Sequence, residues 1–203
     1  MSSGFAQIAF TPAVKRLQER DGSRASYVRG ERAGGGADPL GPDEAAFIGE
    51  RDSFYIATVG ETGWPYLQHR GGAKGFLKLL DAHTIAFADF RGNRQHVSEG
   101  NLAGNDRVAL ILVDYANRRR LKLLGRARVV DAADDPALAG SLAQPGYRAR
   151  IERLVVIRVE AFDWNCPQHI TPRYSEKELG PVVELLRARI RELEEQLNFA
   201  RSI

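Results

Sequence analysis

Residues 53–72, SFYIATVGETGWPYLQHRGG, decide the class of fold. Ser53 to Val59 is rich in β-branched and aromatic side chains, which are typical of a β-strand. Glu61-Thr62-Gly63 predicts a tight turn, after which Trp64 to Arg70 returns as a second strand. Two strands joined by so short a turn form a hairpin, so the sheet is expected to be antiparallel.

The rest of the central region continues this pattern. Four further segments are predicted strands: Thr84 to Ala88, Arg107 to Asp114, Leu121 to Val130 and Leu154 to Phe162. Arg107 to Asp114 is apolar on both faces, so both faces are expected to be covered. One helix, Asn93 to Leu102, is inserted, and no strand-helix alternation indicates a doubly wound sheet. We therefore expect a mostly β protein with peripheral helices, built as an antiparallel barrel.

The two ends of the chain differ from this region. Residues 1–42 are expected to form an extension, with a helix beginning at Thr11-Pro12 and a glycine-rich loop from Gly30 to Pro42. The barrel domain is expected over residues 43–174, beginning with a short helix from Asp43 to Glu50. Residues 175–203 predict a C-terminal amphipathic helix that starts at Gly180-Pro181. Its apolar residues are spaced three and four apart: Val183, Leu186, Ile190, Leu193 and Leu197. Such a seam either packs on its own domain or faces a dimer partner.

The length, composition and charge of the chain limit the classes of protein to which it can belong. The chain has 203 residues, 43% of them hydrophobic and 27% charged, which suits a globular protein with a sizeable core. The net charge of +3 does not indicate nucleic-acid binding, and no apolar run is long enough to span a membrane. A single cysteine excludes an intramolecular disulfide, and the N-terminus lacks a signal-peptide pattern, so we expect a cytoplasmic location.

The first candidate for chemistry is the end of the returning strand, where Gln68-His69-Arg70 is followed by Gly71-Gly72. Glycine in a strand often marks the close approach of a ligand. A flat aromatic ligand could lie on this backbone, with Gln68 and Arg70 supplying polar contacts. The alternative is a bulged strand end with a solvated arginine.

The second candidate is the loop from Asp89 to Gln95. Asn93 begins the expected helix, whose first N–H groups attract anions, and Arg91 and Arg94 add guanidinium groups that suit phosphate. This combination predicts a phosphate cradle, with a solvated basic loop as the alternative. The sequence lacks the Gly-x-x-x-x-Gly-Lys-Ser/Thr pattern, so a nucleotide triphosphatase is disfavoured.

Two other segments carry reactive or charged side chains. Arg118-Arg119-Arg120 is expected to be an exposed basic turn, with Arg120 best placed to meet an anion. Cys166 and His169 could form a nucleophile and its base, but without an orienting acid a buried structural thiol is the favoured interpretation. Two potential ligands fall short of the four in a structural zinc site, so we expect no metal.

From about Asp43 to Phe162 these segments together resemble the pyridoxamine 5'-phosphate oxidase family. The best-matched stretch is Phe87 to Gln95, continuing to Asn101, which falls on an asparagine of the family. Asn93 and Arg94 fall on the two basic positions of the family's phosphate clamp, and Gly92 replaces its serine.

The match extends upstream and downstream of the clamp. Gly63-Trp64-Pro65-Tyr66 is similar to the turn that precedes the family's flavin-binding strand. Gln68 then falls on a family arginine and Ala73 on a lysine, so two cofactor contacts are lost, and Arg70 could compensate. Arg120 falls where the family uses a glutamine against the flavin.

The resemblance implies a split β-barrel of the FMN-binding type and an FMN-dependent oxidoreductase whose small-molecule substrate the sequence does not identify. It implies a homodimer with FMN at the subunit interface, with Gln68 to Gly71 contributed by one subunit and Asn165 to His169 by the other. No catalytic residue is assigned, although His69 or His169 could donate a proton. The expected cofactor-binding residues are Gln68, His69, Arg70, Gly71, Ala88, Asp89, Asn93, Arg94, Arg120, Gln168 and His169.

Other functions stay open at this point. The protein could bind flavin without catalysis, or it could be a haem- or deazaflavin-binding relative on the same barrel. A basic RNA-binding barrel is disfavoured, because the strands lack the exposed aromatic residues on which bases stack.

Overall fold

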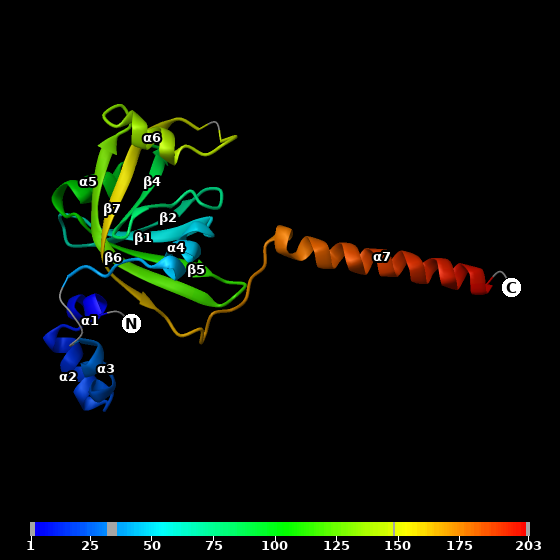
Figure 1. Ribbon diagram of the computed structural model, residues 1–203, viewed down its shortest axis with the longest axis horizontal. Helices are drawn as coiled ribbons and strands as arrows, with labels where there is room; N and C mark the ends of the chain where they lie inside the picture. The colour runs from blue at the N-terminus through cyan, green and yellow to red at the C-terminus, as the bar shows by residue number, and fades with distance from the viewer. Residues whose placement is uncertain (1–2, 32–35, 148, 202–203) are drawn as a thin grey trace. The chain divides into compact units, whose positions relative to one another are not determined.

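The computed structural model describes residues 3–31, 36–147 and 149–201. The chain forms two compact units, residues 1–114 with 119–167 and residues 115–118 with 168–203, and each is described by itself. The first unit contains a seven-stranded antiparallel sheet with the strand order β2-β1-β5-β6-β7-β4-β3 (Figure 1). The predicted fold class, mostly β with peripheral helices, is confirmed.

All of the predicted strands are present, and β3 is additional. The strands are β1 (Ser53–Val59), β2 (Pro65–Gly71), β3 (Lys78–Asp81), β4 (Thr84–Phe90), β5 (Arg107–Asp114), β6 (Arg119–Asp131) and β7 (Ile151–Trp164). The β1–β2 hairpin pairs Val59 with Pro65 and Ser53 with Gly71, as the turn at Glu61-Thr62-Gly63 predicts.

The sheet is rolled into a split barrel. The rings of Phe54 on β1 and Phe87 on β4 lie 5.3 Å apart, although their strands are far apart in the sheet order. Arg70 on β2 and Asp89 on β4 form an ion pair of 2.7 Å. Strands that are separated in the order can meet in this way only if the sheet curves until its two ends approach each other.

The inside of the roll is an apolar core. Phe47 and Ile48 from α4 (Pro42–Gly49) join it, together with alternate side chains of the strands. The strand contributions include Phe54, Ile56, Phe87, Val108, Leu110, Leu112, Leu121, Leu123, Ile157 and Val159. The pairing of β6 with β7 shifts register at Gly125, where a Cβ would lie 2.4 Å from the carbonyl oxygen of Arg158. Only glycine fits this close approach.

Three helices precede the barrel: α1 (Ser3–Ala9), α2 (Pro12–Arg20) and α3 (Arg24–Glu31). The predicted start of α2 is confirmed, because the Thr11 hydroxyl accepts a hydrogen bond from the backbone N–H of Val14. Neither α1 nor α3 was predicted, and α3 includes Gly30, the first residue of the expected loop. Residues 32–35 of that loop lie outside the described residues. Helix α6 (Pro136–Leu142) packs against β4 and β7 and was also missed.

Two helix starts differ from the prediction. Helix α5 (Val97–Gly104) begins four residues later than Asn93, because Arg94 and His96 adopt φ angles of 59° and 54°. Backbone in this left-handed region cannot belong to a right-handed helix. In the second unit, α7 (Glu176–Arg201) begins before Gly180. Its start is fixed by a capping box, in which the Ser175 N–H donates to Glu178 and the Glu178 N–H donates to the Ser175 hydroxyl.

The outer face of β1 and β5 is apolar as well, whereas the outer face of β6 carries Lys122, Arg126 and Arg128 beside Leu124. A cavity of about 550 Å³ on this face is lined by apolar side chains, which include Ile8, Ala57, Val59, Ala109 and Leu124, and by the charged side chains of Arg107, Arg126 and Glu160. Tyr55, on the same face of β1, is 38% exposed. The predicted apolarity of both faces of β5 is therefore present, but within the described residues only the inner face is closed. No described helix is both long and apolar enough to cross a membrane.

Candidate functional site

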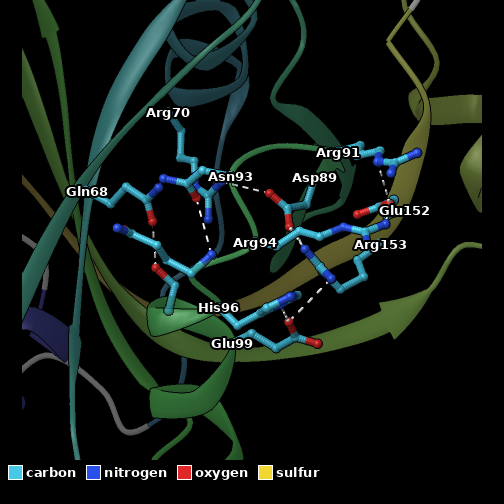
Figure 2. A network of polar contacts seen from close by, with 12 residues as sticks. Gln68, Arg70, Asp89, Arg91, Asn93, Arg94, His96, Glu99, Glu152 and Arg153 are labelled. Carbon is cyan, nitrogen blue, oxygen red and sulfur yellow. Dashed lines mark hydrogen bonds and ion pairs between the residues drawn. The ribbon is translucent and has the colours of Figure 1, made fainter.

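A polar hollow lies where β2 and β4 approach each other, next to the loop of residues 91–96 that leads to α5 (Figure 2). Its volume is about 100 Å³. The strands supply Gln68, Arg70 and Asp89, and the loop supplies Asn93 and Arg94. These five residues were all predicted from the sequence to bind the cofactor, and the rolled sheet brings them together.

Asp89 organises the floor of this hollow. Its Oδ1 accepts a hydrogen bond of 2.7 Å from Nη1 of Arg70. Its Oδ2 accepts two from Arg153, at 3.1 Å from Nε and 3.0 Å from Nη2. Burial is the largest single influence on the pKa of Arg153 and lowers it, but the hydrogen bond to Asp89 and the charges of Asp89, Glu99 and Glu152 together outweigh burial, so the pKa is raised. Arg70 and Arg153 thus share the Asp89 carboxylate, and Glu99, 3.4 Å from Nη1 of Arg153, supplies a second carboxylate on the same side.

Nε of Arg70 is a buried hydrogen-bond donor, and it has no partner among the residues that the structure describes. The guanidinium lies 5.7 Å from the centre of the Phe87 ring, so it is held between the core and Asp89. A buried donor without a partner costs about 1–3 kcal/mol, and a ligand oxygen at this point would remove that cost.

Arg94 lines the rim of the hollow, and Arg91, which is not one of the lining residues, lies three positions earlier in the same loop. Nη2 of Arg94 lies 3.0 Å from Oε1 of Glu152, and Nε of Arg91 lies 3.8 Å from the same oxygen. Both arginine side chains are more than half exposed, at 55% and 57%. The hydrogen bond from Arg94 holds the pKa of Glu152 below its ordinary value, so this carboxylate is ionised and occupies both guanidiniums.

Hydrogen bonds hold the loop in place on both sides. The Ser98 hydroxyl donates to Oε1 of Gln68 at 2.8 Å. Oδ1 of Asn93 accepts from the backbone N–H of Gln95 at 3.2 Å, a turn that fixes the loop before the left-handed His96. The ring of His96 lies 2.5 Å from a carboxylate oxygen of Glu99, which is also 3.4 Å from Nη1 of Arg153. These contacts hold the polar side chains around the hollow in fixed positions.

The other predicted residues do not line this hollow. Ala88 belongs to the buried apolar cluster beneath α6, and His69 packs its ring against Tyr55 at 5.4 Å on the opposite face of β2. Gly71 ends β2, and Arg120 stands opposite Val113 near the start of β6. Gln168 and His169 belong to the second unit. The cofactor-binding role of every one of these residues stays a prediction.

Sequence analysis missed the wall formed by β7. Arg153 is the direct pairing partner of Asp89 in the β4–β7 ladder, and Glu152 precedes it. The signal was the polar start of this strand, Ile151-Glu152-Arg153, immediately before the apolar run that was recognised. The expectation for Cys166 was wrong, since its thiol is exposed in the segment that follows β7. Within the described residues, no three metal-ligating side chains cluster.

Comparisons with known proteins agree with this architecture. The family model described as "Pyridoxamine 5'-phosphate oxidase" matches residues 40–165. Similar solved structures include HupZ of group A Streptococcus, with 16% identity and a TM-score of 0.47 over 66% of this chain and 99% of that chain. A Clostridium acetobutylicum protein related to general stress protein 26 has 16% identity and a TM-score of 0.45 over 64% and 88%. An F420 reductase has 20% identity and a TM-score of 0.43 over 61% and 98%. Comparison with curated proteins gives no match.

Proposed function

The chain belongs to the pyridoxamine 5'-phosphate oxidase family, and on that premise we propose that it is an FMN-dependent oxidoreductase acting on a small molecule. The observation that carries the proposal is the arginine-rich hollow between β2, β4 and the loop of residues 91–96. The family supplies the kind of cofactor, and this hollow supplies a place for its phosphate.

The donors in the hollow suit a phosphate monoester. Arg94 presents a mostly exposed guanidinium at the rim, Arg91 presents a second one in the same loop outside the lining, and the buried Nε of Arg70 has no partner among the described residues. Guanidinium groups bind phosphate oxygens in pairs, which makes arginine better suited to this role than lysine. A single cradle of this kind accounts for one phosphate, as in FMN, and not for a diphosphate.

The size of the hollow limits what it can hold. Sites that enclose a small molecule occupy about 300–1,000 Å³, whereas this hollow has about 100 Å³. The phosphate fits within it, and the ring system of FMN must lie outside. Arg94 and Arg91 would then hold the phosphate, Gln68 would orient the ring through its amide, and the flavin would supply the transfer of hydride or electrons.

A second copy of the chain would complete the site. The outer face of β1 and β5 is apolar, and together with Leu124 of β6 it carries a cavity of about 550 Å³. In a two-fold dimer the same patch is buried twice, once on each subunit. We propose this face as the dimer interface, with water excluded from the flavin ring by the partner subunit and with Gln168 and His169 of the partner subunit as the predicted contacts.

The identity of the cofactor is the first test. The purified protein should show a flavin absorption spectrum, and heat should release a compound that co-elutes with FMN on a column run against FMN and FAD standards. The release of FAD, a deazaflavin or haem from folded protein would contradict the proposal. A folded protein that fails to bind FMN after incubation with it would also contradict the proposal.

The phosphate cradle is tested by Arg94→Ala. We expect the variant to bind FMN more weakly by about 1.5–3 kcal/mol, the value of a hydrogen bond to a charged group. The fold should be unaffected, because this side chain is 55% exposed. Titration of apoprotein with FMN, followed by fluorescence, measures the change. The matched control is Arg128→Ala, which removes an exposed arginine of β6 that does not line the hollow. Equal FMN affinity in both variants would exclude Arg94 from the cradle.

A further inference from the structure

Helix α7 carries an apolar seam that the described residues of its own unit leave exposed. The helix has 26 residues, and none of them is buried. The seam residues are each 39–59% exposed: Val183, Leu186, Ile190, Leu193 and Leu197. Leu179, four residues before Val183, extends the seam towards the start of the helix and is 44% exposed. An amphipathic helix of this kind needs a partner surface to be stable in water.

The order of side chains along the seam indicates the partner. With Val183 at position a of a heptad, Ile190 and Leu197 also fall at a. The d positions along the seam are leucine at Leu179, Leu186 and Leu193, and Ala200 falls at the last d position of the helix. Two of the three a residues, Val183 and Ile190, are β-branched, and β-branched residues at a combined with leucine at d favour two parallel strands over other coiled-coil arrangements. We propose that α7 pairs with α7 of a second copy of this chain as a parallel, in-register, two-stranded coiled coil.

The charges beside the seam select the same orientation. Arg189 occupies a g position, and Glu194 occupies the e position of the following heptad. In a parallel pair, g of one helix faces e of the next heptad on the other, so Arg189 meets Glu194 of the second copy. In an antiparallel pair centred on the same seam, Arg189 meets Arg189 of the second copy instead. Like charges disfavour that arrangement.

The ion pair that Arg189 forms within its own helix does not prevent it from pairing with Glu194 of a second copy. Arg189 now pairs with Glu192 on its own helix, one turn away, and both side chains are more than half exposed. An exposed pair of this kind contributes little, so it can be replaced without much cost. Pro181, the one proline inside the helix, falls at the outer f position and leaves the seam free.

The coiled coil and the barrel interface would support each other. Fewer than three full heptads make a weak coiled coil alone, but two barrels that already associate hold their C-terminal helices at a high effective concentration. The inference thus rests on the dimer of the proposed function for its strength, although its orientation rests on α7 alone. It does not depend on the identity of the cofactor.

Disulfide cross-linking of the full chain tests the pairing. Cys166 is exposed and is first removed by Cys166→Ser. In that background, Leu186→Cys at a d position should form an intermolecular disulfide at least about tenfold faster than Glu195→Cys at the outer f position, because only seam positions face each other in register. Both residues are exposed, so neither change threatens the barrel. Equal rates for the two variants, or no cross-link with Leu186→Cys, overturn the coiled coil.

A charge exchange tests the orientation. Arg189→Glu should slow cross-linking through Leu186→Cys several-fold, since it replaces the attraction to Glu194 of the second copy with a repulsion between two carboxylates. Adding Glu194→Arg should restore the rate in a parallel pair only. Absence of rescue overturns the parallel arrangement. Sedimentation of the same proteins shows whether the coiled coil or the proposed function has failed. A dimer without preferential cross-linking overturns the coiled coil alone. A monomer at all concentrations overturns both the coiled coil and the dimer of the proposed function.

Discussion

The two faces of β1 and β5 are alike in composition and differ in what covers them. On the inner face, Ile56 and Leu110 are each 3% exposed, enclosed by the rolled sheet. On the outer face, Tyr55 is 38% exposed and Ala109 is exposed as well, beside the cavity of about 550 Å³. The chain therefore completes its own core but leaves a second apolar surface open among the described residues. The difference separates what stabilises the fold from what is available for assembly.

The largest expected effect comes from truncating adjacent side chains on the two faces of β5. Leu110→Ala should destabilise the fold by about 2–5 kcal/mol, because it leaves a cavity in a closed core. Ile111→Ala, one residue later on the outer face, should cost less than half as much in dilute protein, where its side chain is only partly buried. Urea unfolding of both variants measures the difference. Equal losses would show that the outer face is already part of the core.

A charge on the outer face should affect assembly and leave the fold intact. Ala109→Asp introduces a carboxylate that the proposed interface would have to bury without a partner, which costs several kcal/mol. We expect the dimer to weaken by about a hundredfold or more, or about 2.7 kcal/mol. Sedimentation measures this change, and Thr62→Asp in the exposed β1–β2 turn adds the same charge elsewhere. A dimer that tolerates Ala109→Asp as well as Thr62→Asp would exclude this face as the interface.

The smallest expected effect concerns the polar hollow. Glu152 occupies Arg94 and Arg91, and it would repel a bound phosphate. Glu152→Gln should therefore tighten FMN binding by about 1 kcal/mol, the scale of two charges about 4 Å apart in water. Because Arg94 lowers the pKa of Glu152, the carboxylate stays ionised throughout the neutral range, and the gain should not vary with pH there. Titration of the parent and Glu152→Gln apoproteins with FMN measures this difference in affinity. Weaker binding by Glu152→Gln would mean that Glu152 positions the arginines for the ligand.

The strands and their inward faces were predictable because their signals are local. Alternation along Ser53 to Val59 and the turn at Glu61-Thr62-Gly63 suffice for the hairpin. The capping box of Ser175 and Glu178 was also present in the sequence, and it marks the start of α7 better than Gly180-Pro181 does. Helix α1 and strand β3 are short and gave no comparable signal.

The far wall of the candidate site was not predictable from local pattern. Arg153 meets Asp89 only because β7 pairs with β4, and the two residues are 64 positions apart. The late start of α5 depends on left-handed backbone at Arg94 and His96, which side-chain contacts such as that of His96 with Glu99 stabilise. Interactions of this kind become visible only when distant segments have been placed together.

We propose that a second copy of the chain, bound through the outer apolar face, completes the FMN site to which the phosphate hollow belongs. Sedimentation of apoprotein and FMN-loaded protein across a dilution series tests it most directly. A ligand that binds only the dimer shifts the equilibrium by mass action. FMN should therefore raise the dimer fraction at low protein concentration, and dilution should release FMN as the dimer dissociates. A loaded protein that stays monomeric, or that keeps its full FMN content after the dimer has dissociated, would contradict the claim.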